Sequence, residues 1–229
     1  MVEEKSAMLP RTRAVAFDAL VIFDLGIVAK RTEEVFPGKG TELGNLWRTR
    51  QFEYTWLRTA GNVYRDFWHV TEDALVYAAK RMQLPLSSAD RERLMKSYQE
   101  LQVWPDVPST LDKLHRHGIR MAFLSNFTAA MLRTNLQAAG LSHFFEEHLT
   151  TDRVRAFKPS PRAYQMGMDY FQCDRQEIVF AAFAPWDAAG AKWFGYRTAW
   201  INLANVPPEE LSFNPDSITP GLSAPGVFF

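Results

Sequence analysis

The first strongly apolar stretch of the chain is short and ends on a carboxylate. Residues 14–17 read Ala-Val-Ala-Phe, and Asp18 follows at once. A continuous apolar run of this length is typical of a strand that is buried on both faces of a parallel sheet. We therefore expect a central strand at 14–17 with Asp18 at its carboxyl end.

The middle block of the chain has helical spacing instead. Between Thr41 and Gly61 the apolar side chains fall on one face of a helix. These positions are Leu43, Leu46, Trp47, Tyr54 and Leu57. Similar patterns run through residues 71–82 and 89–101, so the whole block is predicted to be helical.

From Trp104 onward, helices and strands alternate. Asp106 can cap a helix that has Pro108 in its first turn and Gly118 just past its end. The remaining predicted elements are strands at 119–124, 148–151, 178–182 and 198–201, and helices that begin at Thr128, at Ser160 and near Asp187. Strands that alternate with helices of this length are typical of a parallel sheet covered on both faces.

The simplest organisation is an α/β core domain made of residues 1–25 and 101–229, interrupted after the first strand by a helical cap domain at residues 26–100. The tail from Val206 contains prolines at positions 207, 208, 215, 220 and 225. We expect this tail to be irregular structure that wraps the surface, because proline cannot donate a backbone hydrogen bond.

Polar side chains stand where the predicted parallel strands end. In chain order they are Asp18, Ser125 with Asn126, Lys158, and Trp186 with Asp187. Ligands of an open parallel sheet bind at this carboxyl edge, where the loops from different strands converge. The pattern therefore predicts a site that contains two carboxylates and one ammonium group.

Each of these residues also has a purely structural interpretation. Asp18 and Asp187 can cap a turn or a helix, and Ser125-Asn126 is a common pair at a helix entry. Lys158 before a proline is ordinary loop chemistry. Their occurrence at four successive strand ends favours a functional site over four unrelated caps.

Charge and cysteine content narrow the class of function. The 229 residues contain 26 Lys and Arg against 26 Asp and Glu, so no basic excess favours nucleic acid or an anionic membrane as a partner. No apolar run approaches the roughly 20 residues that span a bilayer. The single cysteine, Cys173, cannot form an internal disulfide or a multi-cysteine metal site. We expect a soluble cytoplasmic protein.

The quoted residues and several longer motifs resemble the haloacid dehalogenase superfamily and, within it, the L-2-haloacid dehalogenase (type II) family. The most specific stretch runs from Leu46 to Arg58. The other matching segments are Phe17-Asp18-Ala19, Phe36-Pro37-Gly38-Lys39-Gly40, Thr71-Glu72-Asp73-Ala74-Leu75, Leu124-Ser125-Asn126, Lys158-Pro159 and Trp186-Asp187-Ala188-Ala189-Gly190-Ala191.

The resemblance implies a Rossmann-like core with a helical cap, and hydrolytic dehalogenation of short (S)-2-haloalkanoic acids to (R)-2-hydroxy acids. Asp18 would attack the halogen-bearing carbon and form an ester that water hydrolyses. Lys158 would keep Asp18 ionised and in place, and Asp187 would position or activate the water.

The resemblance also assigns residues around the substrate. Arg48 and Asn126 would stabilise the departing halide, and Ser125 would hold the substrate carboxylate. The walls of the pocket would be Leu20, Phe67 and Trp186. Members of the family tend to form homodimers through the helical region, and we expect the same of this chain.

The same comparison predicts that no metal or other cofactor takes part. Phosphatases of the superfamily place a second Asp two residues after the nucleophile and use a pair of late acidic residues to bind magnesium. Here those positions hold Leu20 and, before Asp187, Trp186. A hard divalent cation would therefore find too few oxygen ligands.

Four positions depart from the family pattern. Val21 and Ile22 replace a Gly-Thr pair, and Ala182 and Ala184 stand where the family carries Ser and Asn. Hydrogen-bonding groups near the nucleophile and the hydrolytic water are thereby lost. Two alternatives to dehalogenation follow: a catalytically silent protein that binds a small acid, and a hydrolase of this fold that acts on another electrophile.

Overall fold

The computed structural model describes residues 11–224, 226 and 228. Its centre is a six-stranded parallel sheet in the order β5-β4-β1-β6-β7-β8. The strand bounds are Ala14–Phe17 for β1, Arg120–Ser125 for β4, Glu147–Thr150 for β5, Ile178–Ala182 for β6, Arg197–Ile201 for β7 and Ser217–Thr219 for β8. The five strands predicted from the sequence are all present within a residue or two.

The strand β1 lies in the middle of the sheet and all four of its residues are buried. Phe17 is level with Phe123 of β4 on one side and with Ala181 of β6 on the other. The residues that follow these three strands therefore emerge side by side. This register brings Asp18 close to the ends of β4 and β6.

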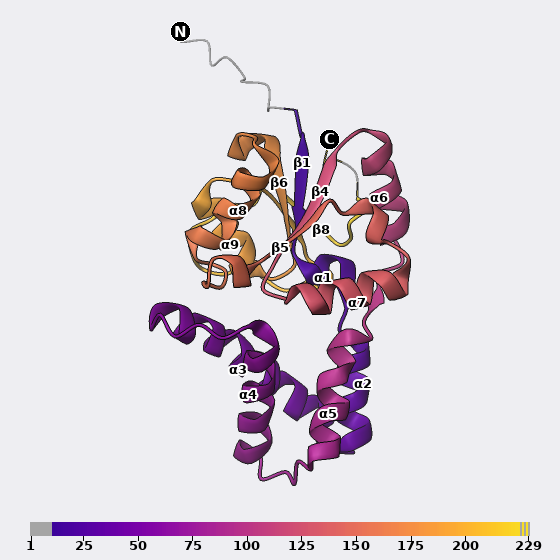
Figure 1. Cartoon of the computed structure of the whole chain (residues 1–229), viewed down its shortest axis with the longest axis vertical. Coiled ribbons are helices and arrows are strands. Elements are labelled where there is room, and N and C mark those ends of the chain that lie inside the picture. The colour runs from indigo at the N-terminus through magenta and orange to yellow at the C-terminus, as the bar shows by residue number, and fades with distance from the viewer. Residues whose placement is uncertain (1–10, 225, 227, 229) are drawn as a thin grey trace.

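Helices cover both faces of the sheet (Figure 1). One apolar core joins Val15 and Phe17 to α6 (Val107–Arg116) and α7 (Ala129–Ala139). A second core joins Ala14 and Ala16 to α8 (Pro161–Phe171) and α9 (Pro185–Phe194). Because both faces of β1 are buried, all of its residues are apolar.

Residues 26–99 form a separate group of helices below the carboxyl edge of the sheet (Figure 1). Its helices are α2 (Gly26–Val35), α3 (Gly40–Ala60), α4 (Phe67–Arg81) and α5 (Ser88–Lys96), followed by the 3-10 turn η1 (Ser97–Gln99). The helix α4 begins four residues before the predicted start because Asp66 accepts a hydrogen bond from His69 N and caps it. Trp47 and Gln51 of α3 both hydrogen-bond Thr71 of α4.

Short elements join this helical group to the sheet. After β1, the four-residue helix α1 (Ala19–Ile22) leads into β2 (Phe23–Asp24), which pairs antiparallel with β3 (Gln102–Val103). These two-residue strands are absent from the sequence prediction, because pairs of this length leave no periodicity to detect. This pairing places the segment that leads into the helical group beside the segment that returns from it to the sheet.

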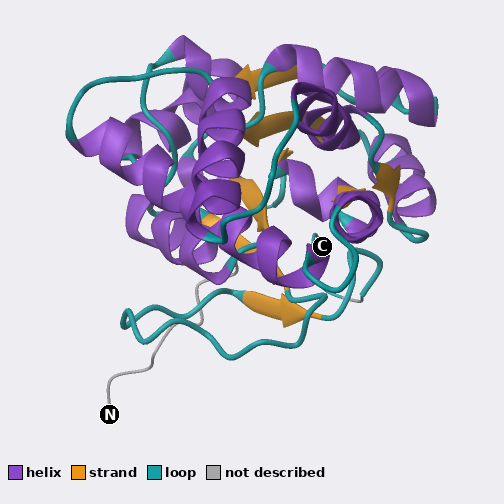
Figure 2. Ribbon diagram, turned by 90° about the horizontal axis from the view of Figure 1, so that it is seen from below, coloured by secondary structure: helices purple, strands orange, loops and turns teal. Residues whose placement is uncertain are grey.

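The expectation of a wholly irregular tail is wrong in one place. Residues 217–219 form β8, which extends the sheet beyond β7. Asp216, just before β8, accepts hydrogen bonds from Thr198 N of β7 and from Lys192 of α9. Figure 2 shows the rest of the tail as a long loop near this edge strand.

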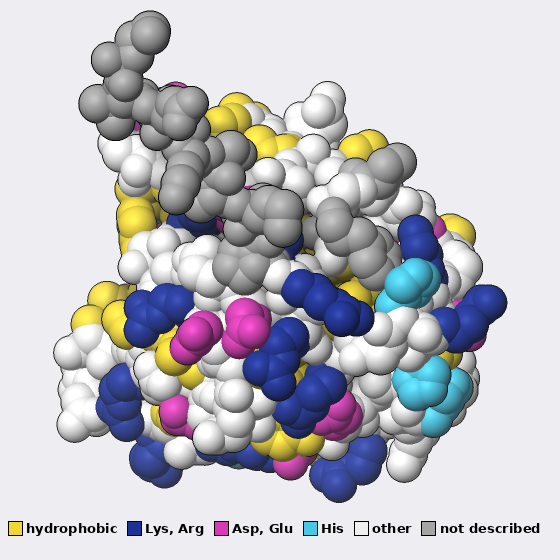
Figure 3. Space-filling view, turned by 90° about the horizontal axis from the view of Figure 1, so that it is seen from above, with side chains coloured by type: hydrophobic (Ala, Val, Ile, Leu, Met, Phe, Trp, Pro, Cys, Tyr) yellow, Lys and Arg dark blue, Asp and Glu magenta, His cyan; other side chains and the backbone are white. Residues whose placement is uncertain are grey.

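The distribution of charge on the surface and the hydropathy of the helices indicate which kinds of partner the protein can have. Lys and Arg side chains lie scattered, with acidic side chains between them, on the end of the molecule away from the helical group (Figure 3). Across the part of the chain that the structure describes, no helix is both long enough and apolar enough to span a membrane.

Asn135 of α7 provides a test of how the chain returns from the helical group to the sheet. Its buried side chain accepts a hydrogen bond from Leu101 N at 2.8 Å and donates to the carbonyl oxygens of Tyr98 and Met131, each at 2.9 Å. We expect Asn135→Ala to lower the free energy of unfolding by about 2–3 kcal/mol, because it leaves buried backbone groups unpaired. Urea denaturation measures this change, with Gln137→Ala on the exposed face of α7 as the control. Equal stability of the two variants would contradict the assignment.

Candidate active site

Three side chains from distant parts of the sequence meet at the carboxyl edge of the sheet. Lys158 Nζ donates to Asp18 Oδ1 at 2.7 Å and to Asp187 Oδ2 at 2.5 Å. The second oxygen of Asp18 accepts from Leu20 N at 3.1 Å, because Asp18 also caps α1. The structure thus brings together the two carboxylates and the ammonium group that the strand ends predicted.

The Lys158 ammonium is almost completely buried, with 1% of its side chain exposed. Burial alone would lower the pKa of Lys158, but the charges and hydrogen bonds of Asp18 and Asp187 outweigh it and hold the pKa above its usual value. Nζ also lies 5.1 Å from the centre of the Phe180 ring. Lys158 is therefore a fixed positive charge.

The two carboxylates have different environments. Asp18 retains 14% side-chain exposure, so a small molecule can reach it, whereas Asp187 is buried. Burial raises the pKa of Asp187 to about 6, although Lys158 opposes the shift, and the nearby charge of Asp18 adds to it. Asp187 can consequently exchange a proton near neutral pH.

Tyr164 of α8 is a site residue that the sequence analysis missed. Its hydroxyl group donates to Asp187 Oδ1 at 2.6 Å. Burial, with the neighbouring carboxylates, raises the pKa of Tyr164 well above its usual value, so the hydroxyl stays protonated. A Cβ atom on Gly190 would lie 2.5 Å from this hydroxyl oxygen, so the glycine allows α9 to approach Tyr164. In sequence, a tyrosine on the apolar face of a helix cannot be distinguished from a core residue.

Ser125 ends β4, Asn126 follows it, and both are buried. Asn126 Oδ1 accepts a hydrogen bond from Lys158 N at 3.0 Å, which ties the loop before α8 to the end of β4. Ser125 Oγ accepts from Phe127 N at 3.1 Å, so the oxygen shapes the turn while its hydroxyl proton is free to donate elsewhere.

Arg48 reaches the site from α3. Its guanidinium lies 4.9 Å from the ring centre of Phe52 and 5.9 Å from that of Phe183. Burial lowers the pKa of Arg48, while Tyr98 and Asp18 act in the opposite direction. Within the described ranges Arg48 forms no ion pair, which leaves its charge available to an anion.

The three predicted wall residues are in different positions around this centre. Leu20 is buried directly beside Asp18, and Phe67 stacks on Phe127 with ring centres 5.3 Å apart. Trp186 packs edge-on against Phe52 at 5.1 Å. Its ring nitrogen Nε1 is buried and has no acceptor among the residues described, so it provides a second free donor near Arg48.

The departures from the family pattern make this region more apolar. Ile22 and Ala182 are completely buried. Ala184 is the N-cap residue of α9 and has no side chain that could make the capping hydrogen bond. Within the part of the chain that the structure describes, the side-chain hydrogen bonds to the carboxylate of Asp187 come from Lys158 and Tyr164.

The residues at this edge do not fit a divalent cation. Lys158 already engages one oxygen of each carboxylate, and Leu20 offers no oxygen ligand in its side chain. In the described portion of the chain, no cluster of three or more His, Cys, Asp or Glu side chains could hold a metal ion.

Comparisons with known proteins agree with this geometry. Residues 14–195 match the family model for haloacid dehalogenase-like hydrolases. A relative from Pseudomonas sp. (strain YL), an (S)-2-haloacid dehalogenase, is 38% identical over 205 residues, which cover 89% of this chain and 88% of that protein.

Solved structures give the same result. The crystal structure of one L-2-haloacid dehalogenase has a TM-score of 0.91 and 39% identity, covering 93% of this chain and 96% of that one. The enzyme of Xanthobacter autotrophicus with covalently bound chloropropionic acid has a TM-score of 0.84 and 30% identity, with 92% and 95% covered. The chain therefore belongs to the haloacid dehalogenase-like hydrolases and, within them, to the L-2-haloacid dehalogenase family.

Proposed function

We propose that this protein hydrolyses the carbon–halogen bond of short (S)-2-haloalkanoic acids and releases (R)-2-hydroxy acids. The observation that carries the proposal is the Asp18 carboxylate, partly exposed and held by Lys158 Nζ at 2.7 Å. An ionised carboxylate in a fixed orientation is the nucleophile that displacement at carbon needs. The relative whose structure holds covalently bound chloropropionic acid supports a covalent intermediate.

The reaction has two balanced steps. A carboxylate oxygen of Asp18 bonds to C2 of the substrate from the side opposite the halogen, and the halide leaves with the bonding electron pair. Asp187 then takes a proton from a water molecule, whose oxygen attacks the carbonyl carbon of the Asp18 ester. The acyl–oxygen bond breaks, the leaving oxygen takes the proton from Asp187, and the 2-hydroxy acid departs while the Asp18 carboxyl group is regenerated. Only the first step changes the configuration at C2, so one inversion results.

Charged and polar groups near Asp18 suit the two anions involved. We assign Arg48 and Asn126 to the departing halide and Ser125 to the substrate carboxylate. The pocket walls are assigned to Leu20, Phe67 and Trp186. The partly buried Arg48, which has no carboxylate partner in the described structure, and the free Nε1 of Trp186 support the halide assignment.

Several broader assignments accompany this function. We propose a core domain of residues 1–25 and 101–229 and a cap domain of residues 26–100, supported by the β2–β3 pair at their junction. We propose a metal-independent enzyme, because Lys158 occupies the place between the carboxylates. We also propose a cytoplasmic location, as expected from the sequence. A homodimer is proposed through α3, whose Leu57 leaves 63% of its surface exposed.

Release of halide is the direct test. Purified protein in metal-free buffer is incubated with each enantiomer of 2-chloropropionate and 2-bromopropionate, beside Asp18→Asn. We expect halide from the (S)-enantiomers alone, and a loss of at least about 1,000-fold in Asp18→Asn because the nucleophile is removed. Unchanged release in Asp18→Asn would refute the nucleophile. No release from folded wild-type protein would favour an acid-binding protein or a hydrolase of another electrophile.

The pH dependence of the reaction tests Asp187. The water-activating form of Asp187 is ionised, so we expect activity to fall as pH drops through about 6. The hydrogen bond from Tyr164 stabilises the ionised form and lowers the pKa of Asp187. Tyr164→Phe is therefore expected to move the acidic limb of the rate profile up by roughly 0.5–1 pH unit. Tyr170→Phe, which changes a tyrosine remote from Asp187, is the control. If activity falls at the same acidic pH in wild type, Tyr164→Phe and Tyr170→Phe, Asp187 is excluded as the base.

Restoring the missing polar groups tests whether the departures slow turnover. In the triple variant Ile22→Thr, Ala182→Ser, Ala184→Asn, hydrogen-bonding groups return near the nucleophile and the hydrolytic water. We expect kcat to rise by about 10- to 100-fold, since one well-placed donor commonly contributes roughly 100-fold or more. Ala181→Ser, a polar change at a neighbouring buried position of β6, is the control. An unchanged kcat in the folded triple variant would mean that other groups have taken over these roles.

A further inference from the structure

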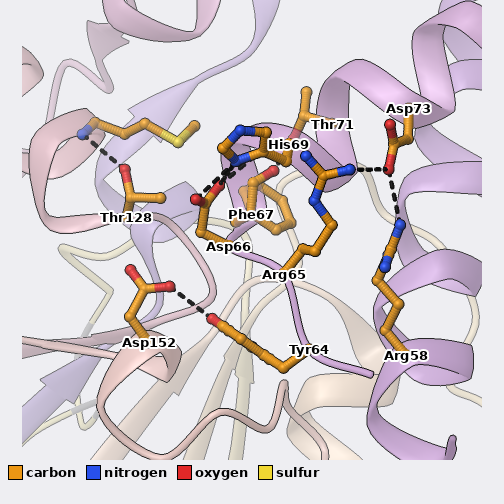
Figure 4. Close-up of polar contacts among 11 residues, drawn as sticks. Arg58, Tyr64, Arg65, Asp66, Phe67, His69, Thr71, Asp73, Thr128 and Asp152 are labelled. Carbon is orange, nitrogen blue, oxygen red and sulfur yellow. Dashed lines mark hydrogen bonds and ion pairs between the residues drawn. The ribbon is translucent and has the colours of Figure 1, made fainter. Parts of the chain in front are cut away.

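A cleft of about 740 Å³ separates the start of α4 from the sheet. Residues 64–66, 68, 69 and 99 of the helical group line one side, and residues 128–130, 152 and 155 of the core line the other. Figure 4 shows Tyr64 crossing this gap to Asp152. The cleft is thus bridged at the level of the loop that leads to Lys158.

The bridge consists of several contacts on this loop. The hydroxyl of Tyr64 donates to Asp152 Oδ1 at 2.7 Å, and its ring lies 4.7 Å from the ring of Phe157. Thr59, at the end of α3, accepts a hydrogen bond from Phe157 N at 3.0 Å. Two residues of the helical group therefore hold the loop at both of its ends.

The held loop leads directly into the active site. Phe157 immediately precedes Lys158, whose backbone N–H donates to Asn126 Oδ1. The side chain of Lys158 must reach both Asp18 and Asp187 within hydrogen-bond distance. A shift of the loop by even 1 Å would lengthen at least one of these contacts.

We propose that Tyr64 is a positioning residue, which places Lys158 between its two carboxylates only when the helical group is docked against the loop of residues 152–158. The inference rests on the proposed function, because it assigns Tyr64 a role in that reaction. Docking of the helices, which also carry Arg48, and assembly of the charged centre then become a single event.

The chemistry of the bridge suits this role. Tyr64 is half-buried, and burial raises its pKa, so the hydroxyl remains a donor over the whole range in which the enzyme works. Arg155 lies over the same ring at 5.5 Å. A misplacement of about 1 Å in a catalytic group can lower the rate on the order of 100-fold. Loss of a single hydrogen bond that holds the loop can therefore lower kcat.

A double-mutant cycle tests the coupling in kinetics. Tyr64→Phe and Asp152→Ala each remove the hydrogen bond, and each is expected to lower kcat about 10-fold while KM changes less than about twofold. The double variant is expected to be no slower than either single one, because both act through the same bond. Asp152→Asn keeps a carbonyl acceptor for the hydroxyl and is expected to restore wild-type kcat.

Tyr170→Phe is the matched control, since the Tyr170 hydroxyl also donates to a carboxylate, that of Glu146 just before β5, at the amino edge of the sheet and away from the site. It is expected to leave kcat unchanged. Thermal unfolding midpoints of all variants are expected to stay within roughly 2–4 °C of wild type, the shift that one lost hydrogen bond gives in a chain of this size.

Hydrogen exchange of residues 152–158 gives a readout that needs no turnover. Tyr64→Phe is expected to speed exchange in this loop at least about fivefold, with no change in Tyr170→Phe. Unaltered exchange would overturn the docking role, and faster exchange with unaltered kcat would overturn the positioning role. If wild-type protein releases no halide, the proposed function fails, while the exchange data still decide whether the bridge holds the loop.

Discussion

The fold is organised around one buried ammonium group. Moving the charge of Lys158 out of water is costly, and only two carboxylates within hydrogen-bond distance offset that cost. Asp18 follows β1, Lys158 lies in the loop after β5 and Asp187 follows β6, so the charge is stable only when these strands are in register within the sheet. The site and the centre of the sheet therefore depend on each other.

Much of this arrangement could be predicted from the sequence. Residues 140 positions apart, such as Asp18 and Lys158, could be paired because parallel strands end at one edge of a sheet. Tyr164 could not be found in this way, since its position in α8 carries the same signal as a core residue. The three-residue strand β8 was also missed, because its pairing depends on β7 and Asp216 rather than on its own sequence.

The apolar residues near the site leave the buried carboxylate of Asp187 with few polar side-chain partners. Ile22, Ala182 and Ala184 carry no polar side-chain group, and among the described residues the side chains that hydrogen-bond the Asp187 carboxylate are those of Lys158 and Tyr164. Burial, together with the nearby charge of Asp18, raises the pKa of Asp187 to about 6 against the opposing effect of these two partners. A more basic carboxylate is a stronger proton acceptor, which compensates in part for a water molecule held by fewer groups.

The edge strand β8 affects how readily the protein aggregates in concentrated solution. It pairs with the outer edge of β7, a strand that is rich in β-branched and aromatic residues around Trp200. Without this cover, β7 would present open N–H and C=O groups to any other chain. The proline-containing tail thus serves as a guard against edge-to-edge aggregation, and a chain shortened before Asp216 would lose solubility before it lost its active site.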